Sequence, residues 1–186
     1  MTLRALTLIA ATLAGTALSA QEGPRFGLQA GVNIPQSDLK DAVDSKPGFT
    51  IGAHGTFDFR GGHMLRPRLD YTWFPSYSHG AAFGASVDQK VSNFALGADY
   101  LYFVEGRPQG FYITGGASAI HWKMEADITI PGIGSGSTSE TTTKLGVAAG
   151  VGYQFNRTVG AEVRYLKSKA WESDLDMIQV GATFRF

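Results

Sequence analysis

The chain has 186 residues, which suits one domain, and its 16 basic and 16 acidic side chains leave a net charge of zero. This balance does not fit a nucleic-acid-binding protein, which needs a basic face. The absence of cysteine excludes disulfides and thiolate metal sites. Glycine is abundant, with 24 residues, and aromatic residues make up 12%. Together they favour an all-β chain with closely packed backbone.

Residues 1–20 have the organisation of a secretory signal peptide. Arg4 precedes an apolar stretch from Ala5 to Ala14, and small residues follow up to Ala20. The apolar stretch is shorter than the roughly 20 residues that a membrane-spanning helix needs, so a signal peptide is favoured over a membrane anchor. We expect cleavage after Ser19 or Ala20 and a single mature domain over residues 21–186.

Eight segments then alternate apolar residues with polar or small ones, with the period of a β-strand. In chain order they are residues 25–35, 48–60, 64–74, 92–103, 111–123, 144–155, 159–166 and 177–186. Each is near the roughly 9–11 residues that cross a bilayer when tilted. The facing of 111–123 stays open, because Ile113 and Ile120 fall on opposite faces. A β-bulge could reconcile them.

The connections between these segments alternate in length. Residues 36–47, 75–90, 125–140 and 167–176 form long polar connections, and residues 61–63, 104–110 and 156–158 form short turns. By composition, 125–140 is a flexible surface loop. A three-residue turn at Gly61-Gly62-His63 would place Asp58 opposite Arg66 and His54 opposite Asp70.

The last segment suggests how the strands are arranged. Ile178, Val180, Ala182, Phe184 and Phe186 alternate with polar or small residues, and pairing with residues 25–35 would remove both sheet edges. This ending resembles bacterial outer-membrane β-barrels, and the mature chain resembles small barrels of the outer-membrane protein A/X type. The resemblance implies an eight-stranded antiparallel up-and-down transmembrane β-barrel with short periplasmic turns and long external loops. It also implies that Phe184 and Phe186 are a signal read by the β-barrel assembly machinery.

Aromatic residues gather at the two ends of the segments, as expected for belts at the two membrane interfaces. One predicted belt, at the short turns, contains Phe57, Phe59, Tyr100, Tyr102, Tyr153, Phe155, Phe184 and Phe186. The other, toward the long loops, contains Tyr71, Trp73, Trp122 and Tyr165. A soluble barrel with an apolar interior has the same alternation. The belts, the signal peptide and the loop asymmetry favour the membrane form, with apolar side chains facing lipid.

That orientation encloses the polar side chains, and an eight-stranded barrel is just wide enough for side chains to fill. We expect a structural polar network inside, formed by His54, Asp58, Arg66, Arg68, Asp70, Asp99, Lys144, Glu162, Arg164 and Arg185. Buried charges must pair or stay hydrated. Their near balance favours a cross-linked core over a wide pore of one charge sign.

We expect no catalytic, cofactor or metal site. His79, His121 and Ser168 lie toward the external side, but no spacing sets a nucleophile beside its base. Asp38, Asp41 and Asp44 lack the glycine and glutamate of an EF-hand loop. The predicted function is a non-enzymatic, monomeric outer-membrane protein that meets lipid with its wall and a surface ligand, in adhesion or environmental contact, with its loops. The alternatives are a small transport or porin-like barrel and an outer-leaflet lipid-modifying enzyme.

Overall fold

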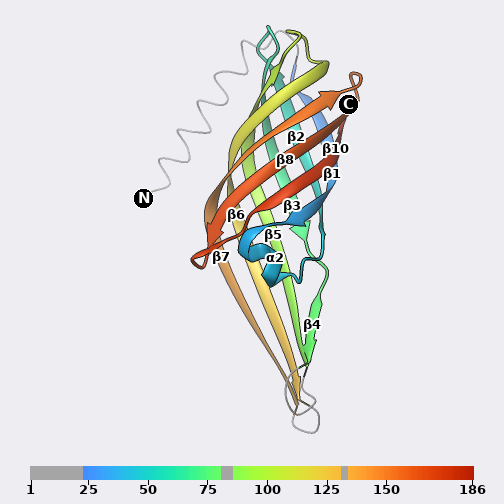
Figure 1. Ribbon diagram of the computed structural model, residues 1–186. Coiled ribbons are helices and arrows are strands. Elements are labelled where there is room, and N and C mark those ends of the chain that lie inside the picture. The colour runs from blue at the N-terminus through green and yellow to red at the C-terminus, as the bar shows by residue number, and fades with distance from the viewer. Residues whose placement is uncertain (1–22, 81–85, 131–133) are drawn as a thin grey trace.

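The computed structural model describes residues 23–80, 86–130 and 134–186, so the predicted signal peptide lies outside the described residues. The main strands are β1 (Arg25–Pro35), β2 (Gly48–Asp58), β3 (His63–Trp73), β5 (Ser86–Phe103), β6 (Gly110–Ile130), β7 (Gly134–Gln154), β8 (Val159–Ala170) and β10 (Met177–Arg185) (Figure 1). The connections contain helix α2 (Ser37–Ala42) and the short strands β4 (Tyr77–Gly80) and β9 (Ser173–Asp174). Within the described ranges no helix has the length and apolar character to span a membrane.

The eight main strands close into a ring of antiparallel neighbours. Strand β10 pairs with β8 on one side and with β1 on the other, where Phe184 lies opposite Leu28 and Ile178 opposite Ile34. The backbone N–H of Phe186 donates to the carbonyl of Phe26 at 2.9 Å. The predicted eight-stranded antiparallel barrel is therefore confirmed.

Large apolar side chains cover the outside of the barrel, and polar ones fill its middle. On β1, Phe26 and Leu28 are exposed while Gly27 and Asn33 face inward. Of the residues predicted for the two aromatic belts, all except Phe57 and Trp122 are exposed on this wall. Strands with apolar residues on the outer face and polar residues on the inner face are expected of a barrel that is surrounded by lipid.

Trp122 was wrongly assigned to the outer aromatic belt. The pairing of β6 with both β5 and β7 continues without a bulge, so the same face of β6 points inward throughout the ring. Ile120 and Trp122 lie on that inner face and are fully buried. The conflict in the sequence therefore arises because β6 carries apolar residues on its outer face at one end and on its inner face at the other.

The predicted register between β2 and β3 was wrong by two residues. The turn does contain three residues, but they are Arg60-Gly61-Gly62, all with positive φ. The N–H of Phe59 donates to the carbonyl of His63 at 2.8 Å. Asp58 consequently lies opposite Met64, and His54 opposite Arg68.

Three of the four long connections consist largely of strand, and two of these prolong the sheet beyond the ring. The β6–β7 pairing runs on to Ile130 opposite Gly134, and β4 pairs with the outer end of β5. The neighbouring strands stop earlier, since β7 meets β8 only from Gly146 onward. Strands β4, β5, β6 and β7 therefore extend beyond the ring as a narrow sheet, at the lower end of Figure 1. We call this the external sheet; it corrects the prediction of a flexible loop at 125–140.

Apolar side chains seal the ring at both ends. At the end that carries the long connections, α2 places Leu39 in the mouth, where with Val43 it packs into a buried cluster. The other members of this outer seal are Phe74, Val91, Ala95, Ile120, Trp122, Ala170, Leu175 and Met177. At the end with the short turns, an inner seal is formed by Met64, Leu101, Phe103 and Tyr112.

Candidate functional site

A network of charged side chains fills the barrel between the two seals. At its centre, Arg66 Nη2 lies 2.9 Å from Asp99 Oδ2 and 2.7 Å from Glu162 Oε2, and all three residues are buried. Arg66 and Asp99 lie opposite one another on the neighbouring strands β3 and β5, whereas Glu162 comes from β8 on the other side of the ring. Charges without a partner are costly away from water, so each ion pair stabilises both of its members. The Arg66–Glu162 pair also links opposite walls of the ring, where backbone hydrogen bonds do not reach.

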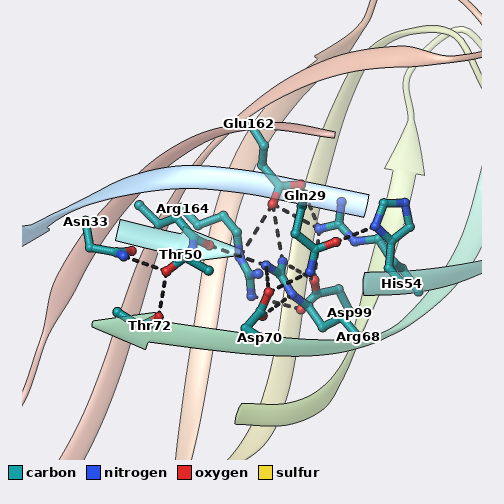
Figure 2. Close-up of polar contacts among 12 residues, drawn as sticks. Gln29, Asn33, Thr50, His54, Arg68, Asp70, Thr72, Asp99, Glu162 and Arg164 are labelled. Carbon is teal, nitrogen blue, oxygen red and sulfur yellow. Dashed lines mark hydrogen bonds and ion pairs between the residues drawn. The ribbon is translucent and has the colours of Figure 1, made fainter. Parts of the chain in front are cut away.

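Two further arginines join the same carboxylates (Figure 2). Arg68 contacts Asp99 at 3.1 Å and Asp70 at 2.6 Å, and Arg164 contacts Asp99 at 3.0 Å. Each acid therefore meets at least one guanidinium, and Asp99 meets three. The whole arrangement is a cross-linked polar core.

Neutral groups extend the network toward the wall formed by β1, β2 and β3. Gln29 Nε2 donates to Asp70 at 2.6 Å, and the Gln29 side-chain oxygen contacts His54 Nδ1. Nearer the loops, Asn33 donates to Thr50 at 2.6 Å, and the Thr50 and Thr72 hydroxyls lie 2.6 Å apart.

Glycines on the inner face provide the space for the acids. Gly116 lies opposite Asp99 on the neighbouring strand, and Gly52 lies opposite Asp70. A Cβ atom at Gly116 would overlap the Asp99 carboxylate, and one at Gly52 would overlap that of Asp70. The high glycine content therefore lets charged side chains lie flat against the wall of a narrow barrel.

Two predicted network residues are placed differently, and a third is buried as predicted but has donor atoms without a hydrogen-bond partner. Lys144 falls on the alternate positions of β7 whose side chains face inward within the ring, but it lies beyond the end of the β7–β8 pairing and is exposed. Asp58 is only half-buried at the β2–β3 turn, where it accepts the N–H of Arg60 at 2.8 Å. Arg185 is buried, yet its Nε and Nη2 have no hydrogen-bond partner among the described residues. The predicted Asp58–Arg66 and His54–Asp70 oppositions are not formed.

Sequence reasoning missed two members of the network. The Tyr112 hydroxyl donates to Glu162 Oε2 at 2.9 Å, and Gln29 bridges His54 and Asp70. The signal for Tyr112 was present, because it alternates with the outward Phe111 and Ile113. Gln29 likewise lies between the outward Leu28 and Ala30.

A second polar cluster lies at the outer rim and holds α2 in place. Asp176 Oδ2 accepts from Tyr165 at 2.7 Å, from Lys167 at 3.3 Å and from Ser37, at the start of α2, at 3.2 Å. Burial alone would raise the pKa of Asp176, but the hydrogen bonds from Tyr165 and Lys167 outweigh it and hold that pKa below the ordinary value of an aspartate. Asp176 therefore stays ionised at neutral pH and fastens α2.

The residues that could carry chemistry do not come together. Ser168 donates to the carbonyl of Leu175 at 3.0 Å, while His121 Nδ1 lies 2.9 Å from the Thr143 hydroxyl on another strand pair. The side chain of His79 lies outside the described residues. In the described parts of the chain, no three His, Asp or Glu side chains form a group that could hold a metal ion.

With the barrel and its polar core described, comparison with known families is direct. Residues 5–186 match the family model described as outer membrane protein beta-barrel domain. The chain belongs to this family. The closed ring, the apolar outer wall and the family match together identify it as a small barrel of the bacterial outer membrane. No protein of curated function shows a significant sequence match.

Solved structures support the same fold. Ail, the attachment invasion locus protein of Yersinia pestis, shares 17% identity, with 88% of this chain and 99% of that chain covered and a TM-score of 0.62. Neisserial surface protein A shares 19% identity, with 89% and 100% covered and a TM-score of 0.56. The N-terminal β-barrel domain of Pseudomonas aeruginosa OprF shares 15%, with 87% and 97% covered and a TM-score of 0.53. At these identities the likeness concerns the fold alone.

Proposed function

We propose that this outer-membrane barrel is a non-enzymatic surface protein that contacts ligands outside the cell through its external loops. The observation that carries this proposal is the external sheet, because it projects beyond the ring on the side of the long connections. A sheet raised above a membrane-embedded ring presents backbone and side chains to whatever approaches the surface. The structural likeness to Ail, named an attachment invasion locus protein, agrees with such a role.

The outer edge of the external sheet has the chemistry to bind an extended chain. From Gly134 to Leu145, β7 pairs with β6 on one side and with no described strand on the other. Most side chains here are exposed, and serine and threonine predominate from Ser135 to Thr143. An unpaired edge offers a row of backbone donors and acceptors to which a partner strand can add. The hydroxyl groups add further donors and acceptors without adding charge.

The interior argues against the transport alternative. A solute crossing the lumen would have to pass the outer seal, the ion pairs around Asp99 and the inner seal. The interior also gives no support to the enzyme alternative, because Ser168 hydrogen-bonds to a backbone carbonyl and His121 to a threonine. We therefore favour surface contact over transport or lipid modification.

Three further features complete the proposal. Phe184 and Phe186 are exposed on the wall beside β1, where the assembly machinery could read them. The signal peptide is removed after Ser19 or Ala20, leaving residues 21–186. The protein works as a monomer, because its ring is closed without strands from another chain.

Shortening the external sheet tests the proposal. Replacing residues 127–137 with Asn-Gly would join Ala126 to Thr138, which already lie opposite one another, by a two-residue turn. We expect cells carrying this variant to lose adhesion to matrix-coated surfaces and host cells. A matched control is Lys40→Ala, which changes an exposed residue of α2 outside the external sheet. Full adhesion by the shortened protein, present at the surface in equal amount, would overturn the proposal.

A further inference from the structure

The end of the barrel with the short turns carries a pocket of about 270 Å³. It is lined by Arg25, Asp58, Arg107, Pro108, Gln109 and Arg157. Arg25 and Asp58 come from the start of β1 and the end of β2, which are neighbours. The other residues come from the β5–β6 and β7–β8 turns, which β3 on one side and β10 on the other separate from β1 and β2. The pocket therefore lies across the mouth of the barrel and faces the periplasm, because short turns are periplasmic in this family.

The turns that present two of the arginines are held by their own hydrogen bonds. Asn156 Oδ1 accepts the N–H groups of Thr158 and Val159, both at 2.8 Å, which fixes the backbone on either side of Arg157. The N–H of Arg185 ties the same turn to β10 by donating to the carbonyl of Thr158 at 2.7 Å. In the other turn, Arg107 is oriented by Glu105, with Nε and Oε2 3.0 Å apart.

Positive charge exceeds negative charge among the residues that the structure describes at this mouth. The pocket lining holds three guanidinium groups and one carboxylate, and Glu105 beside the pocket pairs with one of the three, Arg107. Among the described residues, no carboxylate forms an ion pair with Arg157. Behind the pocket, Arg185 is 3% exposed with two unpartnered donor atoms, and Arg25 lies close enough for its charge to act on Arg185. Guanidinium groups gathered in this way favour an anionic ligand, which they can hold by paired hydrogen bonds.

We propose that this periplasmic mouth pocket binds the carboxylate groups of a peptide. The Asp58 carboxylate on the pocket wall opposes a doubly charged phosphate more strongly than a singly charged carboxylate. Asp58 and Gln109 also offer acceptors for the N–H groups or ammonium that accompany carboxylates in a peptide. The volume admits the end of one or two residues and excludes a folded domain. Peptide carboxylates in the periplasm come from cell-wall peptides or from acidic protein segments, and the chemistry is shared.

Titration of the folded, isotope-labelled protein in detergent micelles tests this site. The probes are a soluble cell-wall peptide fragment, an acidic L-peptide and inorganic phosphate, each followed by chemical shifts of the residues 104–110 and 156–158. We expect one of the peptides to bind, more weakly as salt rises, and Arg157→Gln to weaken it by about tenfold, as for the loss of a charge-assisted hydrogen bond. The control Arg60→Gln removes an exposed arginine of the β2–β3 turn that does not line the pocket, and should leave affinity unchanged.

Each outcome has a defined meaning. Stronger binding of the cell-wall fragment or of the L-peptide supports the site and identifies the source of its ligand. Binding of phosphate alone, binding that Arg157→Gln leaves unchanged, or no binding by any probe would overturn the proposal. A shift in gel mobility on boiling shows that each variant is folded before it is titrated. The result is independent of the external sheet, which lies at the opposite end of the barrel.

Discussion

At the scale of single residues, the charged core depends on a few atoms that serve several partners. Glu162 accepts from Arg66 and Tyr112 and lies 3.5 Å from Arg68. A buried ion pair adds little net stability compared with apolar packing, but removing one partner leaves the other charge unpaired. Replacing a single acid of this core should therefore destabilise the barrel, because several partners lose their counter-charge at once.

The change Glu162→Gln tests this sensitivity. It keeps the shape of the side chain and removes the charge that faces Arg66, so we expect a loss of about 3 kcal/mol in the free energy of unfolding. Urea unfolding in lipid vesicles, followed by tryptophan fluorescence, would measure it. Glu105→Gln is the control, because Glu105 is exposed and pairs only with Arg107 among the described residues. Equal, small effects of the two substitutions would contradict the argument.

At the scale of elements, the sequence predicts the strands, whose outer faces must be apolar in a bilayer. It does not predict how the inward-facing side chains pack. The outer wall must be apolar at alternate positions, so all eight strands could be recognised, with Arg25–Pro35 predicted to the residue. The interior follows no such rule. Ile120 and Trp122 face inward because they pack on α2 and its neighbours, which alternation cannot reveal.

The other misses have physical causes of the same kind. The register of β2 and β3 differs because Arg60 takes a positive φ of 67°, uncommon outside glycine. The serine- and threonine-rich stretch of β7 resembles a flexible loop in composition, and only its pairing with β6 makes it a strand. The interior positions of the buried acids and arginines could be predicted from the alternation of inward and outward side chains along each strand. The exposure of Lys144 could not, because this alternation does not reveal where the ring ends.

Helix α2 is the element whose role depends most on one contact. Leu39 is fully buried in the outer seal, and a six-residue helix has little stability of its own. We expect Leu39→Ala to release α2 and speed hydrogen exchange of residues 37–43 by at least tenfold, since such a truncation costs about 2 kcal/mol or more. Exchange measured by mass spectrometry would show it, with Lys40→Ala as the control. Unchanged exchange in Leu39→Ala would show that the Ser37–Asp176 contact holds α2 without Leu39.

At the scale of the whole molecule, the barrel has two seals in series with a cross-linked core between them. The outer seal includes residues of α2, while the inner seal is built only from the strands β3, β5 and β6. We expect either seal to exclude ions, because a narrow apolar constriction dewets.

The serial arrangement predicts a silent protein in electrical recordings. Purified protein in a planar bilayer should show no large conductance steps, and replacing residues 37–42 with a glycine–serine linker should leave it silent, because Phe103 and Tyr112 still block the other end. Gel mobility before and after boiling would verify folding of both proteins. Large, stable steps from the unmodified protein would contradict the closed interior.

The pairing of β1 with β10 also constrains how the molecule can form. About 150 residues separate Leu28 from its opposite neighbour Phe184, so this seam has the longest loop to close and no local hairpin to assist it. Every other strand pair of the ring joins main strands that follow one another along the chain, so these pairs can form before the two ends of the chain meet. Until the seam forms, β1 and β10 each present a bare edge beside apolar rings. These edges therefore have to be kept from pairing with other copies of the chain during its passage to the membrane. The rate at which β1 and β10 pair determines how long this protection is needed.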